Sequence, residues 1–249
     1  MNATVAVDLA VYLTAIAFGL YAIPRWRRHG VPVLAGLGLA TAPRLAADIG
    51  TGVLITTGAM IGIFAVELAL GVIQAGVADF RPVFALLFGL VLIVQGLIDE
   101  VLMRGMLVSG LSMLLGGRPI VAVLIGAVLF AATHMFLAGA SPLSVISNGL
   151  GGVMYGLAFV LTGRIWLGFG LHFAWNFVQG PILGFTLSGH PTEGGVFQIA
   201  DLGPAWLTGG AYGPEGGVVG IAFRFVIIGA VFAWNIAQDV KKKIYIESS

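Results

Sequence analysis

Long apolar runs alternate along the sequence with short stretches that hold most of the charged residues. Several runs reach the roughly 18 or more apolar residues that a helix needs to cross the hydrocarbon core of a bilayer. The pattern predicts an all-α protein, a polytopic transmembrane helical bundle of about seven spans, with roughly six to nine compatible with the pattern. We expect the spans at residues 5–23, 51–76, 81–115, 119–137, 143–162, 165–187 and 217–237.

Two stretches do not fit this scheme directly. Residues 31–50 are ambiguous, because they could form an interfacial or re-entrant piece or an additional span that changes the topology. Residues 81–115 are too long, since one helix of this length would extend to roughly 50 Å against a hydrocarbon core of about 30 Å. That segment is expected to tilt, break or protrude.

Composition supports a membrane protein. Of the 249 residues, 59% are hydrophobic and only 9% are charged. A soluble domain needs more charge on its surface, so we interpret residues 1–249 as a single integral membrane domain in contact with lipid. The formal net charge of +1, without a basic face beyond short loops, argues against a nucleic-acid partner. The absence of cysteine excludes disulfides, thiol nucleophiles and cysteine metal ligands.

Charge also predicts the orientation. The first span is followed, not preceded, by a basic cluster, which is typical of a retained anchor with its N-terminus outside. With seven spans, the basic connections and the C-terminus fall on the cytoplasmic side, and residues 188–216 form an acidic extracytoplasmic loop. The basic residues are Arg25, Arg27, Arg28, Arg118, Arg164, Lys241, Lys242 and Lys243, and the acidic ones are Glu193, Asp201 and Glu215.

The stretch GLIDEVLMRG, residues 96–105, places charges inside apolar surroundings. Such residues are costly at membrane depth and therefore indicate a functional site. Glu100 and Arg104 are four residues apart, a spacing that favours an ion pair bracing the helix. Asp99 is turned about 100° away from Glu100 and is free to face another element.

Two later spans carry histidines with a polar or aromatic residue one helical turn away. Phe130 and His134 share one helix face, and His172 and Asn176 share another. An acid, two imidazoles and a carboxamide can thus converge on one cavity inside a helix bundle. Either histidine taken alone is more simply a hydrogen-bonding contact between helices.

This set of side chains has a chemical use. A carboxylate in a low-dielectric site can activate water for peptide hydrolysis, and an imidazole can share the proton. An imidazole N–H and an asparagine NH2 can stabilise the oxyanion of the tetrahedral intermediate. Asp99 with His134 fits the first role, and His172 with Asn176 fits the second. The same histidines with Asp99 or Glu100 would alternatively suit a divalent metal such as zinc, although no HExxH motif is present.

The motifs resemble those of a known family. The chain has D99-E100-x-x-x-R104, F130-x-x-x-H134 and H172-x-x-x-N176, in that order on successive expected spans. These are similar to the EExxxR, FxxxH and HxxxN motifs of the CAAX protease and bacteriocin-processing (CPBP, Abi-type) family of intramembrane proteases. The resemblance covers roughly residues 85–180, so we expect residues 81–180 to be the protease core.

The resemblance implies an all-helical membrane endopeptidase, with a prokaryotic plasma membrane as its location. It also implies that Asp99 and His134 activate water without a cofactor, that His172 and Asn176 hold the oxyanion, and that Glu100 belongs to the same catalytic group. Arg104 and Phe130 are expected to brace the helix and line the pocket. Peptide leaders, prenylated C-termini and membrane-protein tails are all compatible substrates, and the sequence predicts no oligomeric state.

One position departs from the family pattern. Asp99 stands where the family has glutamate, and the missing methylene shortens the acid by roughly 1.5 Å; a displacement of about 1 Å can lower a rate on the order of 100-fold. A catalytically inactive scaffold or regulator is therefore the main alternative to a protease. A proton- or ion-coupled transporter is a third possibility, but the chain lacks the repeat symmetry typical of transporters.

Polar residues outside the motifs receive structural roles. Glu67 and Arg224 lie inside expected spans, and we predict that they pair with each other or with Asp8. Asn148 is predicted to be a helix contact, and His190, in the outer loop, needs no role.

Overall fold

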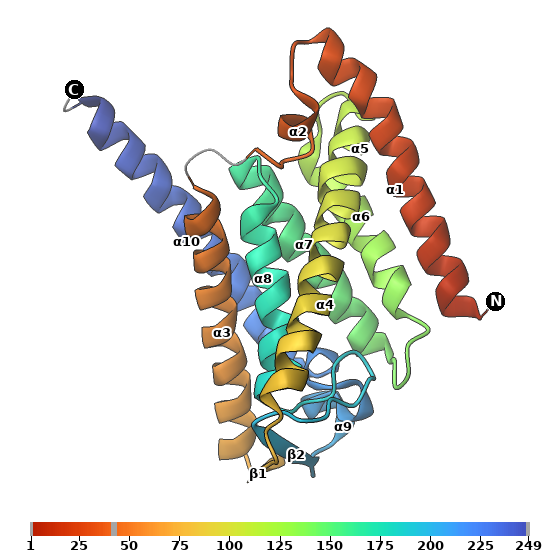
Figure 1. Cartoon of the computed structure of the whole chain (residues 1–249), viewed down its shortest axis with the longest axis vertical. Coiled ribbons are helices and arrows are strands. Elements are labelled where there is room, and N and C mark those ends of the chain that lie inside the picture. The colour runs from red at the N-terminus through yellow and green to blue at the C-terminus, as the bar shows by residue number, and fades with distance from the viewer. Residues whose placement is uncertain (1, 41–43, 248–249) are drawn as a thin grey trace.

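The computed structural model describes residues 2–40 and 44–247, with the backbone alone at residue 239 and from residue 241 onward. Apolar helices that pack side by side make up most of it (Figure 1). The longer helices are α1 (Ala3–Arg28), α3 (Leu45–Ala69), α4 (Pro82–Glu100), α6 (Pro119–His134), α7 (Pro142–Thr162), α8 (Trp166–Phe177) and α10 (Val218–Glu247). The shorter ones are α2 (Val33–Gly36), α5 (Ser109–Leu114) and α9 (Ala205–Thr208), with 3-10 turns at Gly210–Tyr212 and Pro214–Gly216.

The helix lengths agree with a multi-pass integral membrane protein. Within the described residues, five helices are long and apolar enough to cross a membrane, and Pro119–His134 is apolar but shorter. The five are Ala3–Arg28, Leu45–Ala69, Pro82–Leu114, Pro142–Thr162 and Val218–Gln238. The basic connections α1–α2, α5–α6 and α7–α8 lie at one end of the bundle, together with the end of α10 (Figure 1). This shared end is the arrangement that the predicted orientation requires.

Local sequence explains where several helices begin and end. Proline occupies the first turn of α4, α6 and α7, where its missing N–H costs no hydrogen bond. Ser141 and Ser144 form a reciprocal capping box at the start of α7. Gly163 ends that helix in the left-handed conformation, with φ of 67°. These signals place α8, which carries two of the motif residues, directly after α7.

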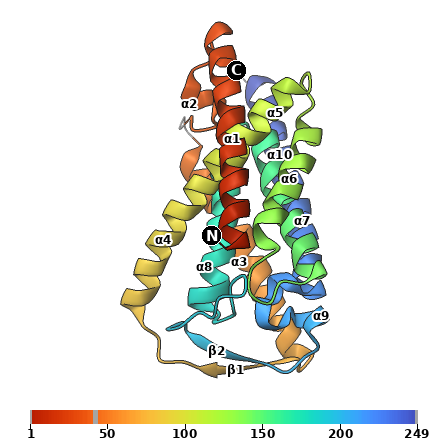
Figure 2. The same ribbon diagram turned by 90° about the vertical axis from the view of Figure 1, so that its right-hand side faces the viewer.

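The long segment predicted at residues 81–115 remains one continuous helix. Its central part, Val101–Val108, is π-helical and joins α4 to α5. The α4 half leans away from the other helices (Figure 2), so the excess length is accommodated by tilt. Of the ambiguous residues 31–50, the described part contains only α2 and the beginning of α3, so residues 31–40 form no additional span; residues 41–43 lie outside the described residues.

The expectation of a purely helical chain was wrong at one end of the bundle. The helix predicted at 51–76 ends at Ala69, and β1 (Ile73–Val77) pairs antiparallel with β2 (Phe197–Asp201). The predicted outer loop therefore contains a strand and helical turns, and the two-stranded sheet closes this end below α8 (Figure 1). Paired strands satisfy the backbone groups of two connections that would otherwise be irregular. The span expected at 165–187 is also shorter, because α8 continues as a π-helical turn only to Ile182.

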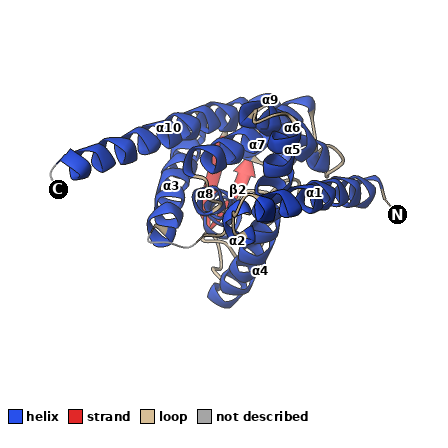
Figure 3. Ribbon diagram, turned by 90° about the horizontal axis from the view of Figure 1, so that it is seen from above, coloured by secondary structure: helices blue, strands red, loops and turns tan. Residues whose placement is uncertain are grey.

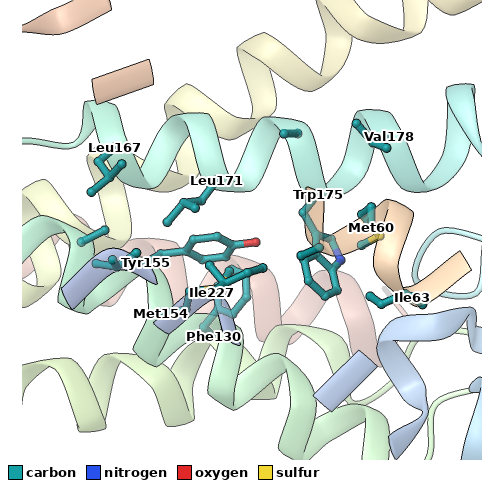
Figure 4. Close-up of a cluster of buried hydrophobic side chains, with 14 of the residues drawn as sticks. Met60, Ile63, Phe130, Met154, Tyr155, Leu167, Leu171, Trp175, Val178 and Ile227 are labelled. Carbon is teal, nitrogen blue, oxygen red and sulfur yellow. The ribbon is translucent and has the colours of Figure 1, made fainter. Parts of the chain in front are cut away.

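The core lies where α3, α7, α8 and α10 meet. Leu167, Leu171 and Trp175 project from α8 toward Met154 and Tyr155 of α7, and the side chains of α3 lie beside Trp175 (Figure 4). Viewed from above, α1 and α10 project to opposite sides of this core (Figure 3). The outward faces remain apolar, as contact with lipid requires; for example, Leu86, Leu90 and Val94 of α4 are exposed.

Glycine allows α3 to approach α8 closely. A Cβ atom added at Gly52 would lie 2.6 Å from the backbone oxygen of Leu167 and 2.7 Å from the backbone nitrogen of Leu171. Small residues at such crossings are the usual means by which membrane helices pack. This contact sets the position of the helix that carries His172.

Gly52→Ala should therefore destabilise the protein by about 1–3 kcal/mol, because the methyl group would force two backbones apart. Gly58→Ala is a matched control on the same helix, since its added Cβ would meet nothing within 4 Å. Thermal unfolding in detergent measures both. Equal unfolding temperatures for the two variants would contradict close packing at Gly52.

Candidate active site

One cavity of about 360 Å³ lies within the bundle and collects most of the motif residues. Asp99, Phe130, His134, His172 and Asn176 all line it, although they come from three different helices. Glu100 and Arg104 do not line it. The structure thus brings four of the five predicted catalytic residues to one cavity, whereas the fifth, Glu100, is buried and does not line it.

Asp99 is held at the cavity by a residue from the first helix. The Tyr12 hydroxyl donates a hydrogen bond to Asp99 Oδ1, at 2.7 Å. Asp99 is largely buried, with 6% of its surface exposed. The Tyr12 bond uses one lone pair of Oδ1, so Oδ2 is the less engaged oxygen, to which a water can donate.

Glu100 faces away from Asp99, as the helix geometry predicted. Its side chain is fully buried, and Oε1 lies 3.1 Å from Arg104 NH1 and 3.2 Å from His172 Nδ1. The expected ion pair is therefore present as a charge contact, without hydrogen-bond geometry at Arg104 NH1. Glu100 serves as the link between the arginine and the second histidine.

The π-helical turn after the acidic pair positions Arg104. Its guanidinium lies 5.1 Å from the ring centre of Phe130 and 5.0 Å from that of Tyr155. Aromatic faces attract a cation, and more strongly when water is excluded. Phe130 thus contacts Arg104 and also lines the cavity, as expected for a pocket residue.

His134 is oriented by its own helix. Its Nδ1 lies 2.9 Å from the carbonyl oxygen of Phe130. A carbonyl can only accept, so Nδ1 carries the hydrogen and the lone pair is on Nε2. The neutral ring therefore offers Nε2 as a proton acceptor.

His172 is fixed from several sides. Nδ1 donates to Glu100, the ring stacks on Tyr155 at 4.8 Å, and Phe130 meets it edge-on at 6.1 Å. Asn176 lies one helical turn further along α8 and lines the same cavity. Because Nδ1 donates to Glu100, Nε2 is the ring atom of His172 that remains for a substrate. When both ring nitrogens carry a hydrogen, Nε2 can donate a hydrogen bond.

Residues outside the motifs also line the cavity, and no sequence pattern predicted them. Glu215 is buried there, and its Oε1 accepts hydrogen bonds from the backbone N–H of Ser188, at 2.6 Å, and from its hydroxyl, at 2.5 Å. Glu215 Oε2 accepts from Trp175 Nε1 at 3.1 Å. Ser188 adopts a positive φ of 47°, which is rare outside glycine, so Glu215 holds a strained turn in place.

Two further assignments needed revision. His190, which was predicted to need no role, lines the cavity. The pairing predicted for Arg224 was wrong, because its NH2 lies 3.6 Å from Glu215 and its Nε donates to Ser147 at 2.9 Å. The position of Arg224 within an apolar span correctly indicated a buried charge. Its partner Glu215 lies in the outer loop, however, and the prediction considered partners only within the expected spans.

Asn148 was predicted to be a contact between helices, but its hydrogen bonds go to its own helix and to the outer loop, and it also lines the cavity. Its Nδ2 donates to the Ser144 carbonyl oxygen and to the Tyr212 hydroxyl, at 2.9 and 2.8 Å. Burial, followed by the charge of Glu215, raises the pKa of Tyr212 above its ordinary value. The tyrosine therefore stays neutral and can accept this hydrogen bond.

The alternative metal set does not form a ligand cluster. Among the side chains that the structure describes, no three from His, Asp or Glu gather closely enough to hold a metal ion. Nδ1 of each cavity histidine faces a protein oxygen, which leaves only Nε2 of each ring for a metal. The expectation of a cofactor-free site stays a prediction.

Part of the chain matches a known protein family. The searches of curated proteins and of solved structures found no match. Residues 81–178 match the model of a family described as Rce1-like, type II CAAX prenyl endopeptidase. The matched segment contains all three motifs and the three helices that carry them. It confirms the resemblance of this part of the chain to the CAAX protease and bacteriocin-processing family.

Proposed function

We propose that this protein is an intramembrane endopeptidase that hydrolyses a peptide bond near or within the bilayer. The observation that carries the proposal is the convergence of Asp99, His134, His172 and Asn176 on one cavity inside an apolar bundle. Buried titratable side chains around a cavity mark functional sites more often than structural ones. The match of residues 81–178 to a peptidase family supports the same conclusion.

In the proposed reaction, Asp99 and His134 activate a water molecule. The water oxygen attacks the peptide carbonyl carbon, and its proton passes to the free carboxylate oxygen of Asp99. Nε2 of His134 shares that proton, which is then given to the nitrogen of the leaving amine. General acid–base catalysis of this kind typically contributes about 100- to 10,000-fold to a rate.

His172 and Asn176 are proposed to stabilise the oxyanion that forms on the carbonyl oxygen. They lie one turn apart on the same face of α8, so both can donate toward one atom. Glu100 holds the histidine ring through Nδ1, with Arg104 beside it. Preorganised donors in a site with little water are worth about 3–4 kcal/mol each.

Tyr12 offers a reason why the shorter acid can be tolerated. Its hydroxyl fixes Asp99 Oδ1, which reduces the freedom of the side chain.

The substrate is proposed to be a peptide or membrane-protein segment, including prenylated C-termini of the kind that the family description names. A prokaryotic plasma membrane is the proposed location.

The proposal is tested by comparing protein termini in cells that carry the wild-type chain, Asp99→Asn or Asp99→Glu at matched expression. Asn removes the proton acceptor and should abolish a specific set of new termini. Glu keeps the carboxylate and should preserve or increase them. The lost termini would identify the substrate.

The main alternative gives a different result. If the three sets of termini are identical while deletion of the whole protein still changes the cells, the chain acts as a scaffold or regulator. Glu193→Gln is a suitable control, because this exposed acid lies outside the cavity.

A further inference from the structure

A second, smaller pocket of about 60 Å³ lies where the end of α3 meets the two-stranded sheet. The segments 184–186 and 208–214 complete its wall. It shares no lining residue with the cavity described above. We refer to it as the Glu67 pocket.

Glu67 has no partner for its carboxylate. The side chain is fully buried, and neither Oε1 nor Oε2 makes a hydrogen bond to any described residue. An unpaired buried carboxylate costs several kcal/mol, so in folded proteins such a group is either neutral or bound to a positive charge. Glu67 is therefore a group that a cation in the pocket would stabilise.

A second carboxylate lines the same pocket. Asp201, at the end of β2, accepts hydrogen bonds from the Thr208 hydroxyl, at 2.8 Å, and from the Gly203 backbone N–H, at 3.0 Å. These bonds fix its orientation and leave lone pairs on both oxygens. No Lys, Arg or His lines the described part of the pocket, so no side chain there balances the two acids.

We propose that the Glu67 pocket binds a calcium ion, with Glu67 and Asp201 as its charged ligands. Two carboxylates match the charge of a divalent cation. Thr208 also lines the pocket and carries a hydroxyl oxygen, and the rest of the described wall includes three glycines. Calcium takes hydroxyl, carbonyl and water oxygens beside carboxylates, in irregular geometry. The absence of lining nitrogen or sulfur side chains disfavours zinc. The volume suits one ion with about one water molecule.

The position of this pocket gives the ion a structural effect on the active site. Thr186 lines the pocket, and the next two residues line the cavity. Gly213 and Pro214 line the pocket, and Glu215 follows them into the cavity wall. An ion at Glu67 would thus hold both segments that carry the Ser188–Glu215 contact. This inference does not depend on the proposed peptidase activity.

The test uses the purified full-length protein in detergent, first treated with EDTA and then titrated with calcium chloride. Isothermal titration calorimetry should show one saturable site per chain, and the unfolding temperature should rise with calcium concentration. Magnesium chloride should have a weaker effect, because magnesium demands regular octahedral geometry. Glu67→Gln and Asp201→Asn should each lower calcium affinity at least tenfold.

The controls are Asp79→Asn and Glu193→Gln, two exposed acids at the same end of the molecule that do not line the pocket. They should bind calcium as the wild type does. Glu67→Gln in EDTA should unfold at or above the wild-type temperature, because the amide removes a buried charge without changing shape. The proposal is overturned if the wild type shows no saturable calcium binding, or if Glu67→Gln and Asp201→Asn both bind as tightly as the controls.

Discussion

Arg104→Met is expected to destabilise the folded protein by about 3–5 kcal/mol, the usual cost of removing one partner of a buried ion pair. Glu100 is fully buried, and Arg104 NH1 lies 3.1 Å from it. Methionine fills a similar volume but leaves the carboxylate with His172 as its one remaining hydrogen-bond partner among the described residues. Thermal and chemical unfolding in detergent would measure the loss.

The double variant Glu100→Gln/Arg104→Met separates charge from packing. It removes both charges at once and should recover most of the lost stability. Arg27→Met is the matched control, since the same change at an exposed arginine should be close to neutral. If Arg104→Met is as stable as Arg27→Met, the Glu100–Arg104 pair contributes no stability.

His134→Gln should lower the rate of peptide hydrolysis by about 100- to 10,000-fold, because glutamine cannot accept the proton that Nε2 accepts. The change keeps a polar side chain in the cavity, but it removes the contacts of Nδ1 with the Phe130 carbonyl and with the Thr133 hydroxyl. Both partners lie on the same helix as His134, so the unfolding temperature should change little. Cleavage of the substrate found from the termini, measured with purified protein, gives the rate.

His29→Gln is the control for this prediction, because His29 is exposed and lies after the first helix, far from the motifs in sequence. It should retain the wild-type rate. A rate for His134→Gln within threefold of the control would exclude the histidine from proton transfer and leave Asp99 to act without it.

Hydropathy was sufficient to predict most of the helices, because lipid requires that backbone polar groups be satisfied within each span. It was not sufficient at Ile73–Val77, where an apolar start to the strand reads like the continuation of α3. Strand pairing there depends on Phe197–Asp201, more than 100 residues later, and no local pattern contains that information.

The same limit applies to the candidate site. Helical spacing correctly separated Asp99 from Glu100, since residues one position apart point about 100° away from each other. Spacing could not find Tyr12 or Glu215, because their contacts with Asp99 and Ser188 join distant parts of the chain. The sequence identified Arg224 as a charged residue within an apolar span, but its partner Glu215 could be found only from the fold.

The residues that line the cavity are synthesised in a fixed order, which has a consequence for assembly of the site. Asp8 and Tyr12 emerge first, Asp99, His134 and His172 follow, and Glu215 and Arg224 come after α8. A nascent chain that has inserted α1 to α8 therefore already carries the motif residues but still lacks the wall that encloses them. The site therefore matures only when the segment after α8 docks and supplies Glu215 and Arg224 to the cavity.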